Sequence, residues 1–256
     1  MSKGVLLIGY GSDKPYNHDA LIANAGRLRE AGLKTYIAFI GAEEPTIRSA
    51  MKLMKEDCVN EIVVIPFMMS SGEMTFRYIP RQMGLDDDRY NCYSVNDMIV
   101  HYVRPVGEDP RIADIIEKHI TSATDIDNTT GIMLITHGSQ MKYSAAMAQN
   151  NADELTRRGF KNVFTAFLDY NEPSIGDCAR FMIKKGIDKI IAVPLIISTG
   201  AHVNTNIPAS LGIPENTSFG SSVMFGNEVD IYITGAIGVG DGFTDLLKTI
   251  VDETLN

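Results

Sequence analysis

The amino-acid sequence predicts an α/β fold of two similar Rossmann-like lobes, each with a parallel sheet flanked by helices. Short apolar runs alternate with segments of helical periodicity, a pattern typical of parallel strands joined by crossover helices. This order of elements occurs twice along the chain. A length of 256 residues is enough for two lobes of about 125 residues, each able to bury a core of its own.

The first half of the chain alternates between expected strands and expected helices. Its first helix carries Leu21 and Leu28 on one face and ends at Gly32, a residue typical of helix C-termini. Pro45 stands at the start of the second helix, where a missing N–H breaks no helical hydrogen bond. The expected strands are 4–9, 35–40, 61–67 and about 101–103, and the expected helices are 19–31, 44–56, a short one ending near 83, and 110–120.

The second half repeats the order of the first. Gly11-Ser12 corresponds to Gly138-Ser139 at a shift of 127 residues. Later positions keep register at shifts of 128 and then 131, as in Phe39 and Phe167, Pro45 and Pro173, Gly72 and Gly200, and Gly107 and Gly238. Because the small insertions fall at loops, we infer the duplication of one βαβαβαβα unit. The polar stretch 121–130 lacks periodicity, which predicts an N-terminal lobe 1–122, a linker 123–130 and a C-terminal lobe 131–256.

Composition narrows the classes of function. The net charge of -9 and the pI near 5.0 argue against a nucleic-acid partner. No apolar segment approaches the roughly 18 residues that a membrane span needs, and no targeting segment is evident, so we expect a cytoplasmic protein with no membrane partner. Cys58, Cys92 and Cys178 lie far apart without a Cys-x-x-Cys motif, which argues against a disulfide framework or a thiolate zinc site.

Three side chains with metal-binding chemistry occur only in the second half, each after a predicted strand: His137, His202 and Asp169. The carboxyl ends of parallel strands meet at one edge of a sheet, so we expect these side chains to converge. Two imidazoles and a carboxylate form a good open site for a divalent metal, and imidazole also accepts protons near neutral pH. The residues opposite them in the first half are Tyr10, Met74 and Gly41, which cannot rebuild the site.

Other polar residues have structural interpretations. Isolated histidines are expected to be solvated or packed in the core, and His18, His101 and His119 lie on helices or near an irregular stretch without an evident partner. For Asp169 both a ligand role and a helix-capping role are open, because Asp residues also cap helices. Glu172 is a capping candidate, since its counterpart Glu44 is present in the half that lacks the site histidines.

Two turns carry further candidates. Ser12 and Ser139 lie where a strand runs into a helix, and each hydroxyl is placed either to cap the turn or to bind a ligand anion. The segment 235–242 contains four glycines, but these do not follow the first strand of a βαβ unit. A turn into the last helix therefore explains it better than a dinucleotide loop.

Four segments of the second half together resemble the sirohydrochlorin cobaltochelatases, relatives of the ferrochelatases within the class II chelatases. These are Leu-Ile-Thr-His-Gly-Ser at 134–139, Ala-Phe-Leu-Asp at 166–169, the run from Val193 to His202, and Asn-Ile-Pro at 206–208. Val-Gly-Glu-Asp at 106–109 also resembles a late turn of that family. The similarity covers nearly the whole chain, once per half.

The resemblance implies two α/β lobes with a tetrapyrrole cleft between them. It implies insertion of Co2+, or in relatives Fe2+ or Ni2+, into a sirohydrochlorin-type macrocycle, without a nucleotide, in cobalamin or related tetrapyrrole biosynthesis. His137 and His202 match the metal-binding, proton-accepting histidines, whereas Asp169 lies at or near a position where the family usually has glutamate. A monomer and a homodimer both fit this family. Candidates for contacts with the substrate are Gly138, Ser139, Ser198, Thr199 and Gly200, with Lys142, Arg77 and Arg81 as nearby cations.

Two alternative functions remain at this point. The first is a non-catalytic carrier of a tetrapyrrole or metal, favoured if aspartate in place of glutamate marks a site that has lost its activity. The second is an unrelated α/β periplasmic-type or nucleotide-binding module, against which the missing signal peptide and phosphate loop count.

Overall fold

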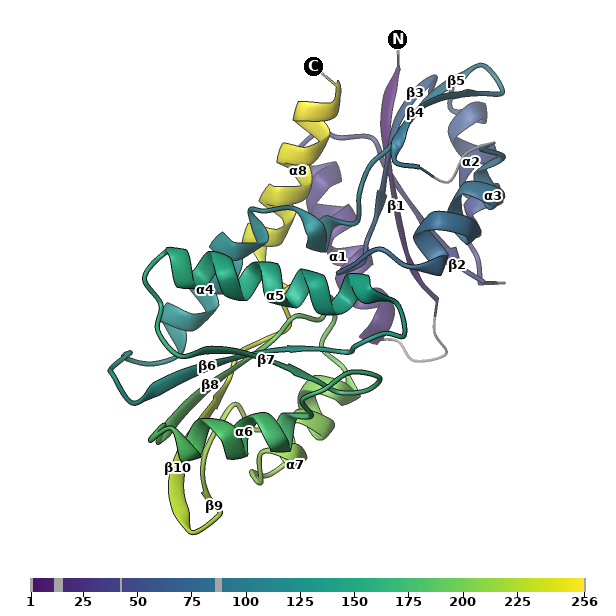
Figure 1. The fold of residues 1–256 in the computed structure, drawn as a ribbon. Helices are drawn as coiled ribbons and strands as arrows, with labels where there is room; N and C mark the ends of the chain where they lie inside the picture. The colour runs from purple at the N-terminus through teal and green to yellow at the C-terminus, as the bar shows by residue number, and fades with distance from the viewer. Residues whose placement is uncertain (1, 12–15, 42, 86–88, 256) are drawn as a thin grey trace. The chain divides into compact units, whose positions relative to one another are not determined.

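The computed structural model describes residues 2–11, 16–41, 43–85 and 89–255 (Figure 1). The chain forms two compact units. The first unit comprises Met1–Asp109 together with Gly240–Asn256, and the second comprises Pro110–Val239. Each unit contains one five-stranded sheet with helices on both faces, so the predicted α/β class is confirmed.

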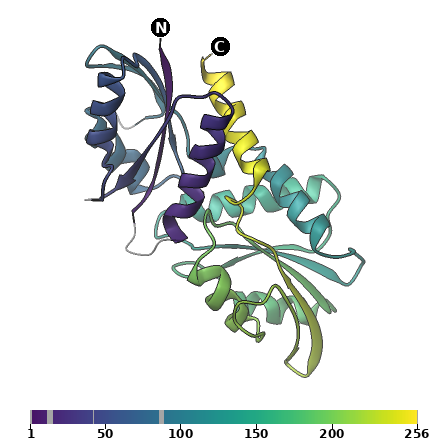
Figure 2. The same cartoon turned by 180° about the vertical axis from the view of Figure 1, so that it is seen from behind.

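The sheet of the first unit has the strand order β2-β1-β3-β5-β4. Its strands are β1 (Lys3–Tyr10), β2 (Thr35–Ile40), β3 (Glu61–Pro66), β4 (Asn91–Val95) and β5 (Met98–Tyr102). Helices α1 (Tyr16–Glu30) and α8 (Asp241–Leu255) lie side by side on one face (Figure 2), and α2 (Ile47–Glu56) and α3 (Ile79–Met83) cover the other. A π-helical turn, η1 (Met74–Tyr78), precedes α3, and a short 3-10 turn, η2 (Val106–Glu108), follows β5.

The sheet of the second unit repeats this order as β7-β6-β8-β10-β9. Its strands are β6 (Thr130–Thr136), β7 (Val163–Phe167), β8 (Lys189–Pro194), β9 (Phe219–Met224) and β10 (Asn227–Ile233). Helices α4 (Ile112–Ala123) and α5 (Lys142–Arg157) cover one face. On the other face lie α6 (Ile175–Lys184) and α7 (Ile207–Ser210), the latter preceded by the π-helical turn η3 (His202–Asn206).

The central strand β6 shows why these runs form parallel strands. All of its residues are buried, because β7 and β8 pair with it on both sides and helices cover both faces. A strand buried in this way has a continuous apolar sequence rather than an alternating one. Met133, Ile135 and Ala166 lie in the core between the sheet and α6.

Each sheet contains one strand more than the sequence predicted. The extra strands, β4 and β9, run antiparallel to β5 and β10 at the edges of the sheets. Their side chains are mostly exposed or half-buried, so they lack the apolar signal of the central strands. A second difference concerns the helix expected from residue 44, because α2 begins at Ile47 with Thr46 as its N-cap, and Pro45 precedes the helix.

The two compact units differ from the predicted boundaries at 1–122 and 131–256. Helix α4 belongs to the second unit, where Arg158 at the end of α5 forms ion pairs with Asp114 and Glu117 at 2.6 and 2.9 Å. Helix α8 belongs to the first unit, where the Phe243 ring packs edge-on against Phe67 at 5.5 Å. Each half of the repeat therefore has its last helix in the unit of the other half. Side-chain packing determines this exchange, and a repeat in the sequence does not reveal it.

Candidate functional site

The three candidate ligands lie at the carboxyl edge of the second unit's sheet. His137 follows the last residue of β6, and His202 begins η3 after β8, which pairs directly with β6. Asp169 follows β7, the neighbour of β6 on its other side. The chain order changes direction between β6 and β8, and such a switch point is a usual ligand site in open α/β sheets. The predicted convergence is therefore present.

The two histidine rings are in contact. Their centroids lie 5.0 Å apart with an angle of 86° between the planes. The Nε2 atom of His137 lies 3.9 Å from Oδ2 of Asp169, which is too long for a hydrogen bond. The side chains of His137 and Asp169 are 47% and 62% exposed, so both are accessible to a ligand from solvent.

His202 lies in a different environment from His137. Its Nδ1 atom is buried and has no hydrogen-bond partner among the described residues. Burial lowers the pKa of His202 and the charge of His137 lowers it further, while the carboxylate of Asp169 and the side chain of Asn206 act in the opposite direction. The lowered pKa favours the neutral imidazole, which is the form that binds a metal or accepts a proton. A buried polar atom without a partner also calls for an explanation, and a ligand is one.

The turn after β6 holds His137 against the loop that carries Asp169. Gly138 has a φ of +87°, and a Cβ at this position would lie 2.0 Å from the backbone oxygen of Asp169. The backbone N–H of Asp169 donates to the carbonyl of His137 at 2.9 Å. At the next residue, the N–H of Ser139 donates to Oδ1 of Asn171 at 2.7 Å. Only glycine permits this approach, so Gly138 has a structural role in the site.

The remaining candidates of the second half lie on the same loops. Ser139 is half-buried, and its Oγ accepts a hydrogen bond from the N–H of Met141 at 3.1 Å, which matches the capping interpretation. Ser198, Thr199 and Gly200 form the loop between β8 and η3; Thr199 is exposed, Ser198 half-buried and Gly200 buried. Their contact with a substrate stays a prediction.

Helix capping explains Glu172. The N–H of Ser174 donates to Oε2 of Glu172 at 2.9 Å. In the first half the N–H of Thr46 donates to Oε2 of Glu44 at 3.0 Å. Ser174 and Thr46 are the N-caps of α6 and α2. The structural interpretation of Glu172 is confirmed, because the half without the histidines uses the same contact.

The three candidate cations lie in different units, and the glycine-rich segment 235–242 has a packing role. Lys142 is exposed at the start of α5, shortly after the His137 turn, whereas Arg77 and Arg81 belong to the first unit. At Gly238 a Cβ would lie 2.1 Å from the backbone oxygen of Ile197, and at its counterpart Gly107 a Cβ would lie 2.3 Å from Met69. The glycines at both positions thus permit close packing against the loop that follows the third strand.

The first unit has different contacts at the equivalent sheet edge. Tyr10 is exposed, and the N–H of Gly41 donates to the hydroxyl of Tyr78 at 3.1 Å. Ser12 lies outside the described residues. The expectation that His18, His101 and His119 lack partners was wrong. His18 and His101 pair with Glu43 and Glu61 at 3.0 and 3.1 Å, and His119 in the second unit bonds the backbone of Gly235. These pairs support their structural interpretation.

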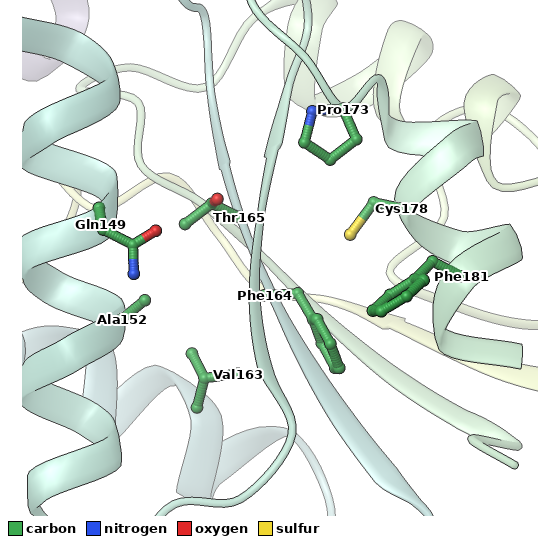
Figure 3. Close-up of a pocket in the computed structure, with 8 residues that line it drawn as sticks. All are labelled: Gln149, Ala152, Val163, Phe164, Thr165, Pro173, Cys178 and Phe181. Atoms are coloured by element: carbon green, nitrogen blue, oxygen red, sulfur yellow. The ribbon is translucent and has the colours of Figure 1, made fainter. Parts of the chain in front are cut away.

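A separate cavity lies at the edge of the second unit's sheet (Figure 3). It has a volume of about 430 Å³ and is lined by residues of α5, β7 and α6 and by the loop before α6. These residues are Gln149, Ala152, Val163, Phe164, Thr165, Pro173, Cys178 and Phe181. None of the candidate ligands lines this cavity, so it is distinct from the histidine site.

Neighbours of the candidate ligands were missed in the sequence. Tyr170 and Asn171 follow Asp169, and Asn206, which the sequence analysis named only as part of the resemblance, lies one turn after His202. Their counterparts in the first half are Ala42, Glu43 and Tyr78. Extending the comparison of the two halves by a few positions around each candidate would have found them.

Among the residues that the structure describes, no three His, Cys, Asp or Glu side chains are gathered as a ready-made metal site. The site therefore consists of a close pair of imidazoles with a carboxylate nearby. None of the described helices is long and apolar enough to span a bilayer.

The sequence model of the CbiX family matches residues 4–123 and again residues 131–254. The chain belongs to the CbiX family. The two matches correspond to the two halves of the repeat and together span nearly all of the chain.

Individual members of the family carry chelatase names. A probable sirohydrochlorin cobaltochelatase of Halobacterium salinarum is 27% identical over 228 residues, covering 80% of this chain and 75% of that protein. A sirohydrochlorin cobaltochelatase of Saccharolobus solfataricus is 31% identical over 126 residues, which are 49% of this chain and 96% of its own length. That relative therefore has about the length of one of the two repeated halves of this chain.

A solved structure shows the same fold. The sirohydrochlorin chelatase SirB of Bacillus subtilis subspecies spizizenii, in complex with cobalt, matches with a TM-score of 0.69 and 17% identity. The match covers 99% of this chain and 95% of that one. All three of these similar proteins thus carry the name of a sirohydrochlorin chelatase or cobaltochelatase.

Proposed function

We propose that this protein inserts a divalent metal, Co2+ foremost, into sirohydrochlorin or a related tetrapyrrole in cobalamin or related tetrapyrrole biosynthesis. The observation that carries the proposal is the contact between His137 and His202 at the carboxyl edge of one sheet. The Nδ1 of His202 is buried there and has no hydrogen-bond partner in the described part of the chain. Fe2+ and Ni2+ are alternative substrates, because imidazole also suits iron and nickel as a ligand. We infer a single active centre, in the second unit.

The imidazoles supply two functions in this proposal. A neutral ring nitrogen donates its lone pair to the metal ion before transfer, and burial keeps His202 in that neutral form. Asp169 is close enough to His137 to join as a ligand or to stabilise a protonated His137. The side chain of Asp169 is one carbon shorter than that of glutamate. We therefore propose the two histidines as the main metal ligands and Asp169 as a secondary one.

Proton balance explains the need for bases. Insertion of one M2+ ion into the macrocycle releases two pyrrole protons, with no change of oxidation state and no bond hydrolysed. We expect His137 and His202 to accept these protons once the metal has left them, with Asp169 as a further acceptor. We therefore expect no requirement for a nucleotide.

A macrocycle that carries several carboxylates needs local donors, because the net charge of -9 repels anions at long range. Lys142 is a candidate donor, since it is exposed and follows the His137 turn in the same unit. The loop residues Ser198 and Thr199, and backbone N–H groups near Gly138 and Gly200, are further candidates.

The test is anaerobic absorbance of sirohydrochlorin with Co2+, Ni2+ or Fe2+, comparing the protein with its His137→Ala and His202→Ala variants. We expect insertion faster than the uncatalysed control, and loss of at least about 100-fold in either variant, the scale of a lost general base. His101→Gln is the matched control, because it retains a hydrogen-bonding group for Glu61 in the other unit. Full turnover in His202→Ala would refute the assignment.

A carrier is the second candidate. The lack of a ready-made three-ligand group among the described residues, and the aspartate at position 169, favour it. The same experiment separates the two functions, because a carrier shifts the tetrapyrrole spectrum in proportion to protein concentration without turnover.

A further inference from the structure

Tyr170 has an unusual backbone conformation beside the histidine pair. Its φ is +62°, in the left-handed region that a bulky residue rarely adopts. The N–H of Asn171 donates to the carbonyl of Asp169 at 2.7 Å, spanning Tyr170. A hydrogen bond over one residue with a positive central φ is a γ-turn of the rare, strained form. Glycine or asparagine would adopt this conformation with less strain. The backbone of the turn therefore does not account for a tyrosine at this position.

The surrounding contacts hold this turn in place. The N–H of Asp169 donates to the carbonyl of His137, and Oδ1 of Asn171 accepts the N–H of Ser139. Both residues that flank Tyr170 are thus bonded to the turn that carries His137. Strain that is maintained by such contacts is found preferentially at functional sites.

The turn presents an aromatic ring to solvent next to a candidate metal ligand. Tyr170 is 66% exposed, more than most of the large apolar side chains that the structure describes. Its ring centroid lies 6.1 Å from that of His137, with 30° between the planes. Packing in the core therefore does not explain the side chain. The first half has alanine at the equivalent position, 42. The tyrosine and the two site histidines are therefore absent from the same half.

We propose that Tyr170 is a substrate-contacting residue whose exposed ring stacks on the conjugated face of the tetrapyrrole and holds it beside His137. This proposal rests on the proposed chelatase function and names a binding contact within that site. An aromatic ring suits this role, because a flat conjugated ligand gains both apolar burial and π-stacking from it. The hydrogen bonds on both sides of Tyr170 fix the backbone from which the ring projects, so less backbone freedom is lost on binding.

Two substitutions separate the ring from the backbone. Tyr170→Asn removes the ring but keeps a residue that tolerates a positive φ, and Tyr170→Phe keeps the ring but removes the hydroxyl. The measurement is a titration of each protein with metal-free sirohydrochlorin, followed by absorbance, with Co2+ binding and the unfolding midpoint recorded in parallel. These readouts distinguish substrate contact from a structural role.

We expect Tyr170→Asn to weaken sirohydrochlorin binding about tenfold, the scale of a lost aromatic contact, without weakening Co2+ binding or lowering the unfolding midpoint. Tyr170→Phe should bind within about twofold of the wild type. Equal affinity of the wild type and Tyr170→Asn would overturn the role of the ring while leaving the chelatase function intact. Absence of sirohydrochlorin binding by the wild type would overturn both.

Discussion

At the scale of single residues, the histidines of this chain differ in what their ring nitrogens contact. His18 and His101 each lie at hydrogen-bond distance from a glutamate. His202 instead has a buried Nδ1 to which none of the described residues is hydrogen-bonded, and its ring packs against that of His137. Residue type alone does not separate these cases. Their position does, because His137 and His202 follow β6 and β8 at the carboxyl edge of the sheet, and the carboxylate of Asp169 lies 3.9 Å from His137, beyond hydrogen-bond distance.

Gly138→Ala tests the close approach of the His137 turn to the Asp169 loop. The added Cβ would lie 2.0 Å from the oxygen of Asp169 at a φ of +87°, so we expect a loss of about 1–3 kcal/mol in unfolding free energy and a loss of chelation. Urea unfolding and the absorbance assay measure the two effects. The matched control is Gly159→Ala, which has a φ of +99° and no atom within 4 Å of its Cβ. If both variants lose only about 1 kcal/mol and keep activity, the contact has no role in the site.

Thiol reactivity gives a second test at this scale. Cys58 and Cys92 are exposed, whereas Cys178 is buried and its burial raises the thiol pKa to about 12. Only the thiolate reacts, so a thiol reagent near neutral pH should label two cysteines quickly and the third only after denaturation. Mass spectrometry of the labelled peptides identifies them. Rapid labelling of Cys178 in the native protein would contradict the structure.

At the scale of elements, the two halves share their helix caps and π-helical turns, whereas they differ in the residues of the candidate site. Helices α2 and α6 both begin at a hydroxyl N-cap preceded by a glutamate that bonds the cap N–H. The turns η1 and η3 are π-helical at equivalent positions, although only η3 begins with a histidine. The widened turn is therefore part of the duplicated scaffold, and we propose that the histidine at its first position gives η3 its role in the site.

Ser174→Ala tests the cap of α6. The Oγ of Ser174 accepts the N–H of Asp177, and loss of this bond should destabilise the protein by about 1 kcal/mol. Thr46→Ala in α2 should have an effect of similar size, because Oγ1 of Thr46 accepts the N–H of Ser49. Urea midpoints measure both. Thr121→Ala, an exposed helical position, should stay within about 0.5 kcal/mol of the wild type, and a larger effect there would contradict the assignment to caps.

The environment of α4 predicts a pH dependence of stability. Burial lowers the pKa of His119, and a bond with the backbone of Gly235 opposes this only in part. The unfolded chain then binds a proton at higher pH than the folded one, so stability falls as pH drops below about 6.5. His119→Gln should weaken this dependence, seen in urea midpoints at several pH values between about 5 and 8. Identical pH profiles would show that His119 makes no contribution.

At the scale of the whole molecule, the compact units do not follow the repeat. The second unit begins at Pro110 and ends at Val239, so it contains α4 and excludes α8. All three candidate ligands lie within it. The ion pairs of Arg158 with α4, and the packing of Phe243 against Phe67, stabilise the exchanged arrangement.

A pair of fragments tests this division. Residues 110–239 should fold cooperatively and bind Co2+, because they include the unit and its site. Residues 131–256, the half defined by the repeat, should not fold cooperatively, since α4 no longer covers the sheet and α8 has lost its partners. Circular dichroism during urea unfolding compares them. Cooperative unfolding of 131–256 alone would show that the repeat boundary is the physical one.

The sequence by itself determined the fold class, the duplication and the pair of histidines. Buried parallel strands produce long apolar runs that are visible without a structure, and comparison of the halves isolated His137 and His202. The antiparallel strands β4 and β9 were missed, since exposed edge strands carry little apolar signal. Only the tertiary structure revealed the γ-turn at Tyr170, the close approach at Gly138 and the exchange of α4 and α8. These features depend on contacts between residues distant in sequence, or on backbone angles that side-chain chemistry does not specify.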